Sequence, residues 1–264
     1  GTNETRPTRT ATPESVASAT GIAGATATAT TLTRTATAQP TGTAVASPTA
    51  AGCGSVTTFA DDLAPTRALH VAVDGSDANG DGSSDRPFAS VARAASRAAP
   101  GTAIVVHAGR YPGGQWVDGL RGTADAPIWI GGAPGEPRPV LEGGSEGLHL
   151  TRPAYVIVHD LIVTDATGNG INCDDGGDVA DRLAAHHVVF RDIAIADIGG
   201  TGNQDCLKLS GLDHFTVVDV EIARCGGRTA GSGIDMVGAH HGVIARSAFT
   251  ECSGSGVQAK GGST

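Results

Sequence analysis

Apolar and polar residues alternate with a period of two along the second half of the chain, which is the pattern of β-strands. Four such segments superimpose without gaps, and they begin at Val156, Val188, Phe215 and Gly242. Their starts are 32, 27 and 27 residues apart. Each is followed by a Gly-rich turn and a second short alternating motif. Copies of this second motif span residues 147–151, 170–174, 206–210, 233–237 and 256–260.

The repeat length restricts the architecture. Units of this size are too short for a strand–helix–strand crossover. Self-similarity with a period of 20–50 residues indicates a solenoid, a propeller or an array of small units. A leucine-rich repeat is not supported, because no L-x-x-L-x-L frame occurs. A propeller is not supported either, because each blade needs hairpins and about 40 residues. Three short strands per turn with Gly turns predict an all-β fold, a parallel β-helix.

Residues 69–150 are expected to form the first coils of this solenoid. Alternating runs at 69–73, 103–107 and 127–130 predict strands. Between them, residues 87–99 predict a helix that ends at Pro100 and Gly101. Its apolar face contains Phe88, Val91, Ala94, Ala95 and Ala98. We expect this amphipathic helix to cap the N-terminal end of the solenoid.

Residues 1–60 differ in composition from the rest of the chain. The first 50 residues contain 16 Thr and 12 Ala but only five charged residues and no aromatic residue. Such a segment buries too little apolar surface to offset its ordering entropy, so we predict a disordered Thr/Ala/Pro-rich spacer. Residues 61–264 are predicted to be the β-helix domain. Its end at Gly-Gly-Ser-Thr without a capping segment suggests a truncated C-terminus.

Charge and cysteine content exclude several classes of protein. The net charge of −9 argues against a nucleic-acid partner, and no apolar run approaches the ~18 residues of a membrane span. The five cysteines form no C-x-x-C pair and make a poor disulfide framework. Cys225 and Cys252 occupy equivalent repeat positions, where we expect inward packing rather than a disulfide. The spacer suggests an extracellular protein, secreted or tethered to the cell surface, and we expect a monomer.

The N-terminal runs resemble a known family. These runs are Val71-Ala-Val-Asp-Gly-Ser-Asp, Asp85-Arg-Pro-Phe-Ala-Ser-Val-Ala-Arg-Ala and Pro100-Gly-Thr-Ala-Ile-Val-Val-His-Ala-Gly-Arg-Tyr-Pro. They are similar to the opening of right-handed parallel β-helix proteins of the pectate-lyase-like superfamily, most of all the family 9 polysaccharide lyases. The resemblance implies an extracellular protein that acts on polysaccharides. In that family a calcium held by aspartates and a lysine base perform β-elimination on uronate sugars.

Stacking the second motifs in register produces three columns, with about 4.8 Å between coils. The inward column contains Leu148, Ile171, Leu207, Ile234 and Val257. The next column, which points outward, contains His149, Asn172, Lys208, Asp235 and Gln258. The second outward column contains Thr151, Asp174, Ser210, Val237 and Lys260. The only two lysines of the chain are thereby predicted to share one outward face.

This face is the candidate active site for a lyase. β-Elimination from a uronate needs a base at C5, and a lysine loses its proton more readily than an arginine. We therefore predict Lys208 as the base, with Asp235 and Lys260 as further catalytic residues. His149, Asn172 and Gln258 are predicted to bind the substrate, an acidic polysaccharide.

Calcium is the predicted cofactor, because it can neutralise the uronate carboxylate and prefers oxygen ligands. The candidate ligands are Asp174, Asp175, Asp178 and Asp205. The first three flank or lie in an inserted loop at 175–181, which accounts for the 32-residue spacing. The competing interpretation is that these residues are only solvated surface carboxylates.

Two other functions remain open at this point. The segment Asn203-Gln-Asp-Cys-Leu-Lys resembles the Asn-x-Asp-Asp-Cys-Leu segment of polygalacturonases, which are β-helical hydrolases with paired aspartates. Inverting hydrolysis needs two carboxyl groups ~6.5–9.5 Å apart, a separation that Asp205 and Asp235 are candidates to provide. The other alternative is a non-catalytic, carbohydrate-binding or adhesive β-helix.

Three further patterns have mainly structural interpretations. His187, His214 and His241 recur every 27 residues, which predicts a ladder of stacked imidazoles, with a metal stack as the alternative. Asp160, Asp192, Asp219 and Arg246 align at a predicted bend, where Asp caps turn amides. Residues 77–82 match the start of a calcium loop, or else form a plain Asp/Gly turn.

Overall fold

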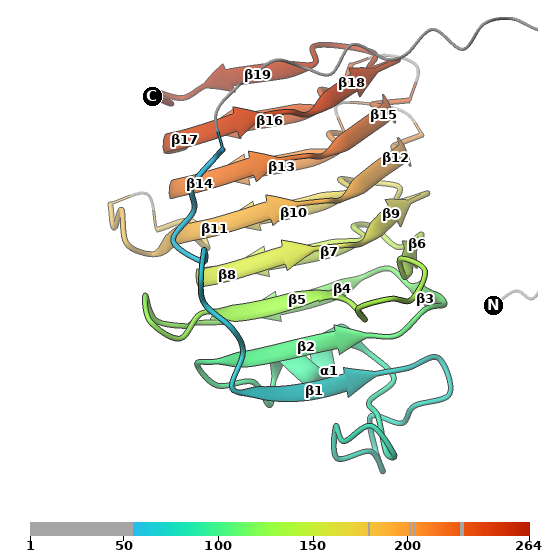
Figure 1. Ribbon diagram of the computed structural model, residues 1–264. Coiled ribbons are helices and arrows are strands. Elements are labelled where there is room, and N and C mark those ends of the chain that lie inside the picture. The colour runs from blue at the N-terminus through green and yellow to red at the C-terminus, as the bar shows by residue number, and fades with distance from the viewer. Residues whose placement is uncertain (1–54, 179, 201, 203, 228–229) are drawn as a thin grey trace, which may run out of the picture. The chain divides into compact units, whose positions relative to one another are not determined.

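The computed structural model describes residues 55–178, 180–200, 202, 204–227 and 230–264. The chain divides into two compact units, residues 1–52 and 53–264, and the description below concerns the second. The spacer predicted at residues 1–60 therefore lies almost entirely outside the described residues. In the second unit the strands of successive coils stack from β1 to β19 (Figure 1).

Within the described residues the strands form three sheets in which all neighbours are parallel. Sheet A contains β1 (Arg67–Val71), β2 (Thr102–Val106), β5 (Ile128–Gly132), β8 (Ala154–His159), β11 (Ala185–Arg191), β14 (Leu212–Val218) and β17 (His240–Ala245). Sheet B contains β3 (Arg110–Pro112), β6 (Val140–Glu142), β9 (Ile162–Thr164), β12 (Ala194–Ile198), β15 (Glu221–Cys225) and β18 (Ala248–Thr250). Sheet C contains β4 (Gln115–Asp118), β7 (Leu148–Thr151), β10 (Ile171–Asp174), β13 (Leu207–Ser210), β16 (Ile234–Val237) and β19 (Val257–Lys260).

The repeat detected in the sequence corresponds to one coil with a strand in each sheet. Each segment of the first repeat contributes a strand to sheet A and, after a bend, a strand to sheet B. The second motif supplies the strand of sheet C. The predicted register is confirmed: Phe190 pairs with Val217 in sheet A, and Ile195 pairs with Ile222 in sheet B. The prediction of a parallel β-helix is therefore confirmed.

The bends between sheets A and B use left-handed backbone conformations. Asp160, Asp192 and Asp219 have φ angles of 50°, 53° and 55°. L-residues adopt this region at a cost, and Asp is among the residues that tolerate it best. The predicted bend is confirmed, but the Asp219 carboxylate pairs with Arg246 (Oδ2 to Nη2, 2.6 Å) on the next coil. This aspartate thus connects neighbouring coils, a contact that was not predicted.

Inward side chains from the three sheets form one continuous apolar core. The inward column of sheet C is fully buried from Leu148 to Ile234, and Phe190 of sheet A is 0% exposed. Burying a side chain of this size stabilises the fold by about 1.5–3 kcal/mol. Because each coil contributes few such side chains, the core depends on stacking of neighbouring coils.

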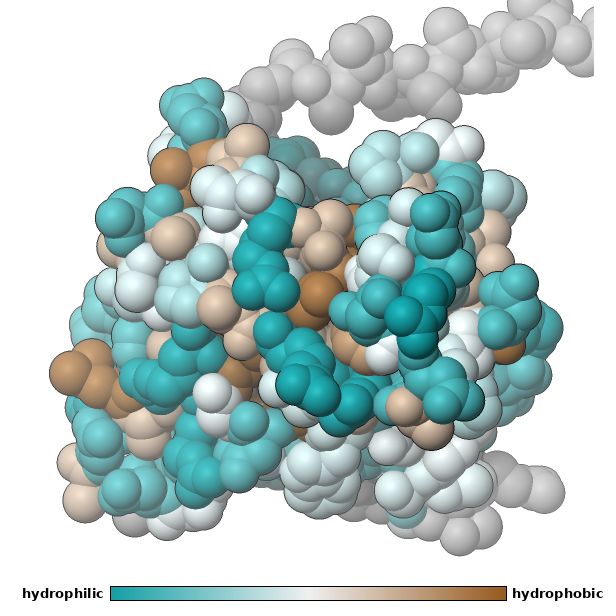
Figure 2. Space-filling model, turned by 90° about the horizontal axis from the view of Figure 1, so that it is seen from below, coloured by the Kyte–Doolittle hydropathy of each residue, from teal (hydrophilic) through white to brown (hydrophobic). Residues whose placement is uncertain are grey.

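The predicted N-terminal helix is present but shorter than residues 87–99. Helix α1 (Val91–Ala95) begins after Ser90, whose Oγ accepts a hydrogen bond from Arg93 N at 3.1 Å. Its apolar face is buried as predicted, and it contacts β1, β2 and β4 at the start of the solenoid. Seen from this end, hydrophilic residues are interspersed with neutral and hydrophobic ones (Figure 2). No helix in the described ranges is long and apolar enough to cross a bilayer.

Residues ahead of the predicted domain boundary pack on the outside of sheet A. Ala60 is 4% exposed and belongs to a cluster with Trp129, Ile157 and Val189, against which Phe59 also packs. The ring of Phe59 lies edge-on to Tyr155, with 5.5 Å between centroids. The packed region thus includes residues 59–60, on the N-terminal side of the boundary predicted at residue 61.

The loop at residues 77–82 forms a turn held by protein groups. Asp77 Oδ1 accepts hydrogen bonds from Ala89 N (2.8 Å) and Ser90 N (3.0 Å). The Arg86 guanidinium contacts the Asp81 carboxylate and the Asn79 carbonyl oxygen. These contacts occupy oxygens that a calcium ion would need, so the geometry supports the turn and not the calcium loop.

The cysteines correct one expectation. Cys206 and Cys225 form a disulfide with a Cα–Cα distance of 5.4 Å, although the odd cysteine count argued against a disulfide framework. Cys225 is inward and buried as predicted, but it is not a free thiol. Cys173 and Cys252 are free cysteines, so the expectation that Cys225 and Cys252 are not bridged is confirmed.

The Cys206–Cys225 disulfide closes a loop with a sequence separation of 19 residues. Constraining a loop of this size in the unfolded chain contributes about 3 kcal/mol. We predict that the Cys206→Ala/Cys225→Ala variant unfolds at lower urea concentration, with a free energy of unfolding lower by about 3 kcal/mol. Cys252→Ser, which removes a free thiol, should have a much smaller effect. A stability of the double variant equal to that of Cys252→Ser would contradict the assignment.

Candidate functional site

The outward face of sheet C contains the predicted active-site residues in the expected order. Strand pairing aligns Lys208 with Asn172 on one side and with Asp235 on the other. The next strand places Gln258 beside Asp235, and Lys260 beside Val237. Alternation within each strand turns these side chains away from the core. Both predicted outward columns are confirmed by this register.

Lys208 and Lys260 both bind the carboxylate of Asp235. Lys208 Nζ contacts Asp235 Oδ2, and Lys260 Nζ lies 3.0 Å from the same oxygen. Asp235 is 0% exposed, whereas the side chains of Lys208 and Lys260 are 19% and 40% exposed. The structure thus brings together the three predicted catalytic residues, with the carboxylate beneath two partly exposed ammonium groups.

Asp205 lies beside this cluster, on the segment that precedes β13. Its Oδ2 is 3.6 Å from Lys208 Nζ, and its Oδ1 accepts a hydrogen bond of 2.7 Å from Ser232 N. Burial raises the pKa of Asp205, and the neighbouring Asp235 adds to the increase. Burial also acts to raise the pKa of Asp235, but hydrogen bonds from both lysines outweigh it and lower that pKa. The two carboxyl groups therefore differ in their tendency to hold a proton.

One atom of this cluster has no hydrogen-bond partner. Asp235 Oδ1 is buried and accepts no hydrogen bond, which is costly for a carboxylate oxygen. Both lysines contact the other oxygen of this carboxylate, Oδ2.

His149 forms a second cluster farther along the same face. Its Nδ1 lies 2.5 Å from Glu146 Oε2, and its Nε2 lies 2.6 Å from Asp174 Oδ2. Asn172 Nδ2 donates to the same oxygen of Asp174 at 2.8 Å. Burial lowers the pKa of His149, but hydrogen bonds to Asp174 and Glu146 outweigh it and raise the pKa to about 9. His149 and Asn172, predicted to bind substrate, are thus buried and engaged by protein groups.

Trp116 extends this cluster and was missed by the sequence analysis. It pairs in register with His149, and the two rings stack with centroids 3.9 Å apart. Its side chain is exposed. The signal was present, because Gly114-Gln-Trp-Val-Asp118 is an additional copy of the second motif. Glu146 was also missed, since it precedes the strand and aligns with no outward column.

The four predicted calcium ligands do not converge. Asp205 precedes β13, whereas Asp174 pairs with Ser210 at the opposite end of that strand, so the prediction that Asp205 joins the other three is wrong. Asp174 Oδ1 accepts from Gly176 N, and Asp175 Oδ1 accepts from Gly177 N. Asp178 is exposed. In the described part of the chain, Asp174, Asp175 and Asp178 do not bring three ligand atoms within 4.8 Å of one another.

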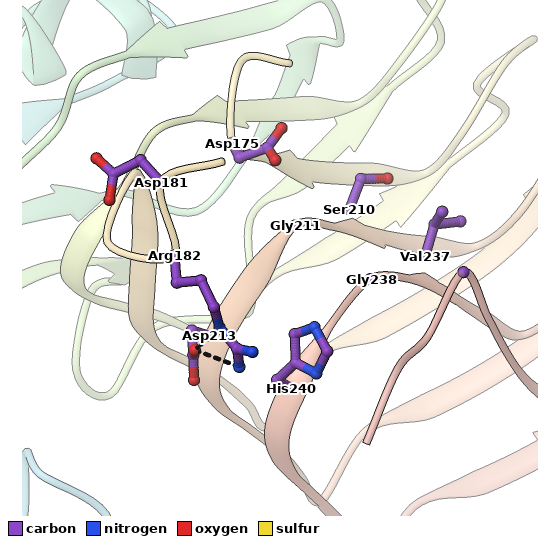
Figure 3. Close-up of a pocket in the computed structure, with 10 residues that line it drawn as sticks. Asp175, Asp181, Arg182, Ser210, Gly211, Asp213, Val237, Gly238 and His240 are labelled. Carbon is purple, nitrogen blue, oxygen red and sulfur yellow. Dashed lines mark hydrogen bonds and ion pairs between the residues drawn. The ribbon is translucent and has the colours of Figure 1, made fainter. Parts of the chain in front are cut away.

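Asp175 instead lines a hollow of about 270 Å³ at the edge of sheet C (Figure 3). The hollow lies between the inserted loop and the turns that follow β13 and β16. Asp175 lies close against Gly211, where a Cβ atom would be 2.0 Å from Asp175 Oδ2. Gly211 also has a φ of 63°. Glycine therefore fits this position both because a Cβ atom has no space and because the backbone is left-handed. Lys208 and Lys260 do not line this hollow, which is a separate feature of the surface.

The paired aspartates do not have the geometry of an inverting hydrolase. Asp205 and Asp235 both contact Lys208 Nζ, so they lie closer than the ~6.5–9.5 Å that such an enzyme needs. The expectation that this pair falls in that range is therefore wrong. Both side chains are at most 2% exposed, which keeps a sugar from reaching them. Asn203 of the corresponding motif lies outside the described residues.

His149 should make stability depend on pH. Its pKa in the folded state is about 9, compared with 6.5 for the free side chain. Protonated His149 therefore contributes fully below about pH 6.5, and the contribution is lost as pH rises through about 9. We predict that urea unfolding of the wild type loses up to about 3 kcal/mol across this window. His149→Gln should lose much less.

The matched control for this measurement is His159→Gln, which removes a histidine that contacts one carboxylate, that of Asp160. This variant should keep the pH dependence of the wild type. Equal pH dependence in the wild type and His149→Gln would show that the cluster does not hold a proton on His149.

Comparison with known proteins identifies the fold. No family model matches the chain, and no curated protein matches its sequence. Among solved structures, the pectate lyase Pel9A is 20% identical with a TM-score of 0.51, covering 68% of this chain and 48% of that structure. The GH136 lacto-N-biosidase from Eubacterium ramulus is 14% identical with a TM-score of 0.53, covering 73% and 43%. An alginate lyase from Paenibacillus sp. is 19% identical with a TM-score of 0.48, covering 72% and 69%.

The chain spans less than half the length of the pectate lyase and of the lacto-N-biosidase that it matches. These two proteins differ in their named activities, and both are similar in fold to this chain. The resemblance inferred from the N-terminal motifs is confirmed at the level of fold: the chain forms a parallel β-helix and is similar in structure to the pectate lyase Pel9A.

Proposed function

We propose that this protein cleaves an acidic polysaccharide by β-elimination on the outward face of sheet C, with Lys208 as the base. The observation that carries the proposal is the pair of lysines held by Asp235 on that face. The fold supports it, since a similar structure is named as a pectate lyase. We further propose that the protein acts outside the cell as a monomer.

The roles of the three residues follow from their exposure. In its neutral form, Lys208 Nζ takes the proton from C5 of a uronate. The C5–H electrons form the C4–C5 double bond, the C4–O4 bond breaks, and the leaving oxygen takes a proton from water. Lys260, the more exposed lysine, neutralises the uronate carboxylate. Asp235, predicted as catalytic, is fully buried and is instead a positioning residue for both amines.

The ion pair with Asp235 has a consequence for the two lysines when substrate binds. A bound uronate carboxylate would draw Lys260 toward it and leave Asp235 paired with Lys208 alone.

Calcium stays a proposal drawn from the family resemblance. Asp174, Asp175 and Asp178 do not form a cage as arranged, since oxygens of Asp174 and Asp175 already accept hydrogen bonds from the loop. No step above depends on the ion. A chelator added to the assay tests whether calcium contributes: a loss of activity restored by calcium supports these ligands.

The non-catalytic alternative uses the same face. The two partly exposed ammonium groups and the exposed ring of Trp116 would also hold an anionic glycan without cleaving it. The two functions differ in their product, since only a lyase generates unsaturated uronate ends. Measuring binding separately from product formation therefore distinguishes the two functions.

The test is a panel of polygalacturonate, alginate and glycosaminoglycan substrates. We expect at least one to yield a product with the ultraviolet absorbance of an unsaturated uronate. New reducing ends without that absorbance would indicate hydrolysis and overturn the proposal. Binding without either signal would support the non-catalytic alternative, and no interaction with any substrate of the panel would reject both.

On the substrate that is cleaved, Lys208→Ala and Lys208→Arg should lower kcat by about 10²–10⁴-fold, the usual contribution of a general base. Arginine keeps the positive charge but stays protonated, so it does not act as a base. The control is Arg224→Ala, which removes an exposed ion pair with Asp197 on sheet B. That variant should retain the wild-type rate. Wild-type activity in Lys208→Ala would remove the base assignment.

A further inference from the structure

A histidine-rich corner outside the candidate active site surrounds one buried carboxylate. Three dipeptides spaced 27 residues apart lie within the first three residues of successive strands of sheet A: His186-His187, Asp213-His214 and His240-His241. Strand pairing aligns His186 with Asp213, and Asp213 with His240. The Asp213 carboxylate therefore occupies one column, between His186 and His240. The residues that follow these three in sequence are all histidines and form a second column beside the first.

The second column is the ladder predicted from the sequence. His187, His214 and His241 have φ angles of 53°, 53° and 51°, so their side chains leave the backbone in the same direction. The rings of His187 and His214 stack at 4.7 Å with an interplanar angle of 3°. Those of His214 and His241 stack at 4.8 Å and 29°. The stacked ladder is confirmed, and the larger angle is found where the carboxylate joins it.

Asp213 uses its two oxygens differently. Oδ2 accepts hydrogen bonds from Arg182 Nε (2.8 Å) and Nη2 (2.7 Å), a contact drawn in Figure 3. Oδ1 lies 2.8 Å from His214 Nδ1 and 2.7 Å from His241 Nδ1. Burial acts to raise the pKa of Asp213, but hydrogen bonds from His241 and Arg182 lower it to about 2. The carboxylate is thus ionised and oriented by Arg182 toward both rings.

We propose that Asp213, His214 and His241 bind a divalent transition-metal ion of the zinc type. Among the described residues, only these three bring His, Cys, Asp or Glu donor atoms together within 4.8 Å as a group of three or more. Two imidazole nitrogens and one carboxylate oxygen form a donor set that suits zinc. Arg182 acts on the carboxylate as the outer partner that orients a metal ligand.

The accessibility of the ligands fits an exchangeable site. The side chains of His214 and His241 are 54% and 60% exposed, whereas that of Asp213 is 8% exposed. The exposed rings can tilt toward one ion while the anchored carboxylate stays in place. Three protein ligands leave a coordination position open to water or a small anion. The ion would also join β14 to β17, because its ligands come from both coils.

This site is distinct from the calcium site considered above. Calcium prefers oxygen ligands, and two of the three donors here are nitrogens. It also does not depend on the lyase proposal, since no residue of the outward face of sheet C belongs to it. Failure of one proposal leaves the other standing.

The test is calorimetric titration of the full chain, freed of metal, with zinc chloride. We expect one zinc ion per chain, bound through the Nδ1 atoms of both imidazoles. His214→Ala and His241→Ala should each weaken binding by at least about 10-fold, the minimum seen even for residues that only orient a ligand. Calcium chloride present in excess should not compete.

The matched control is His187→Ala, which removes a ring of the same ladder that is not a ligand. Its zinc affinity should stay within about 3-fold of the wild type, a difference below 1 kcal/mol. No saturable binding of zinc to the wild type would overturn the proposal. Unchanged affinity in both His214→Ala and His241→Ala, or equal losses in His187→Ala, would overturn it as well.

Discussion

Hydrogen bonding between equivalent strands of successive coils is the constraint on which the rest of this structure depends. Parallel pairing places each residue beside its counterpart on the next coil, roughly 4.8 Å away. Apolar positions therefore stack on apolar positions, and the core continues from Leu148 to Ile234 without interruption. A shift by one residue would turn the inward column outward along a whole strand. The left-handed bends preserve this register because they recur at the same position of each coil.

The same stacking concentrates charge on the outside. Lys208, Asp235 and Lys260 come from three consecutive coils and meet because the register aligns them. A carboxylate that is fully buried needs compensating partners, and here the amines of Lys208 and Lys260 supply them. On the corner of sheet A, Asp213 occupies the corresponding role among imidazoles. In both places a chemical cluster arises from residues about 27 positions apart, with no local motif.

The repeat made much of the fold and part of the candidate site predictable from the sequence. Alternation and spacing were sufficient to place Lys208 and Lys260 on one face, since the register follows from the repeat alone. They did not reveal the burial of Asp235, which depends on the long side chains that cover it. The separation of Asp205 from Asp174 was missed because the two lie at opposite ends of paired strands. The disulfide joins the residue before a strand of sheet C to the last residue of a strand of sheet B, two positions that no repeat alignment places together.

The disulfide has a mechanical consequence for a chain that is pulled at its ends. A parallel β-helix yields to tension by peeling coils from either end, because each coil is held mainly by its neighbours. Cys206 and Cys225 lock most of one coil into a covalent ring, so the residues between them cannot contribute to extension while the bond is intact. Peeling that reaches this ring from the C-terminal side would therefore release less chain than peeling of a coil without a disulfide. The tension would then pass through the bonded sulfur atoms to the coils on the N-terminal side.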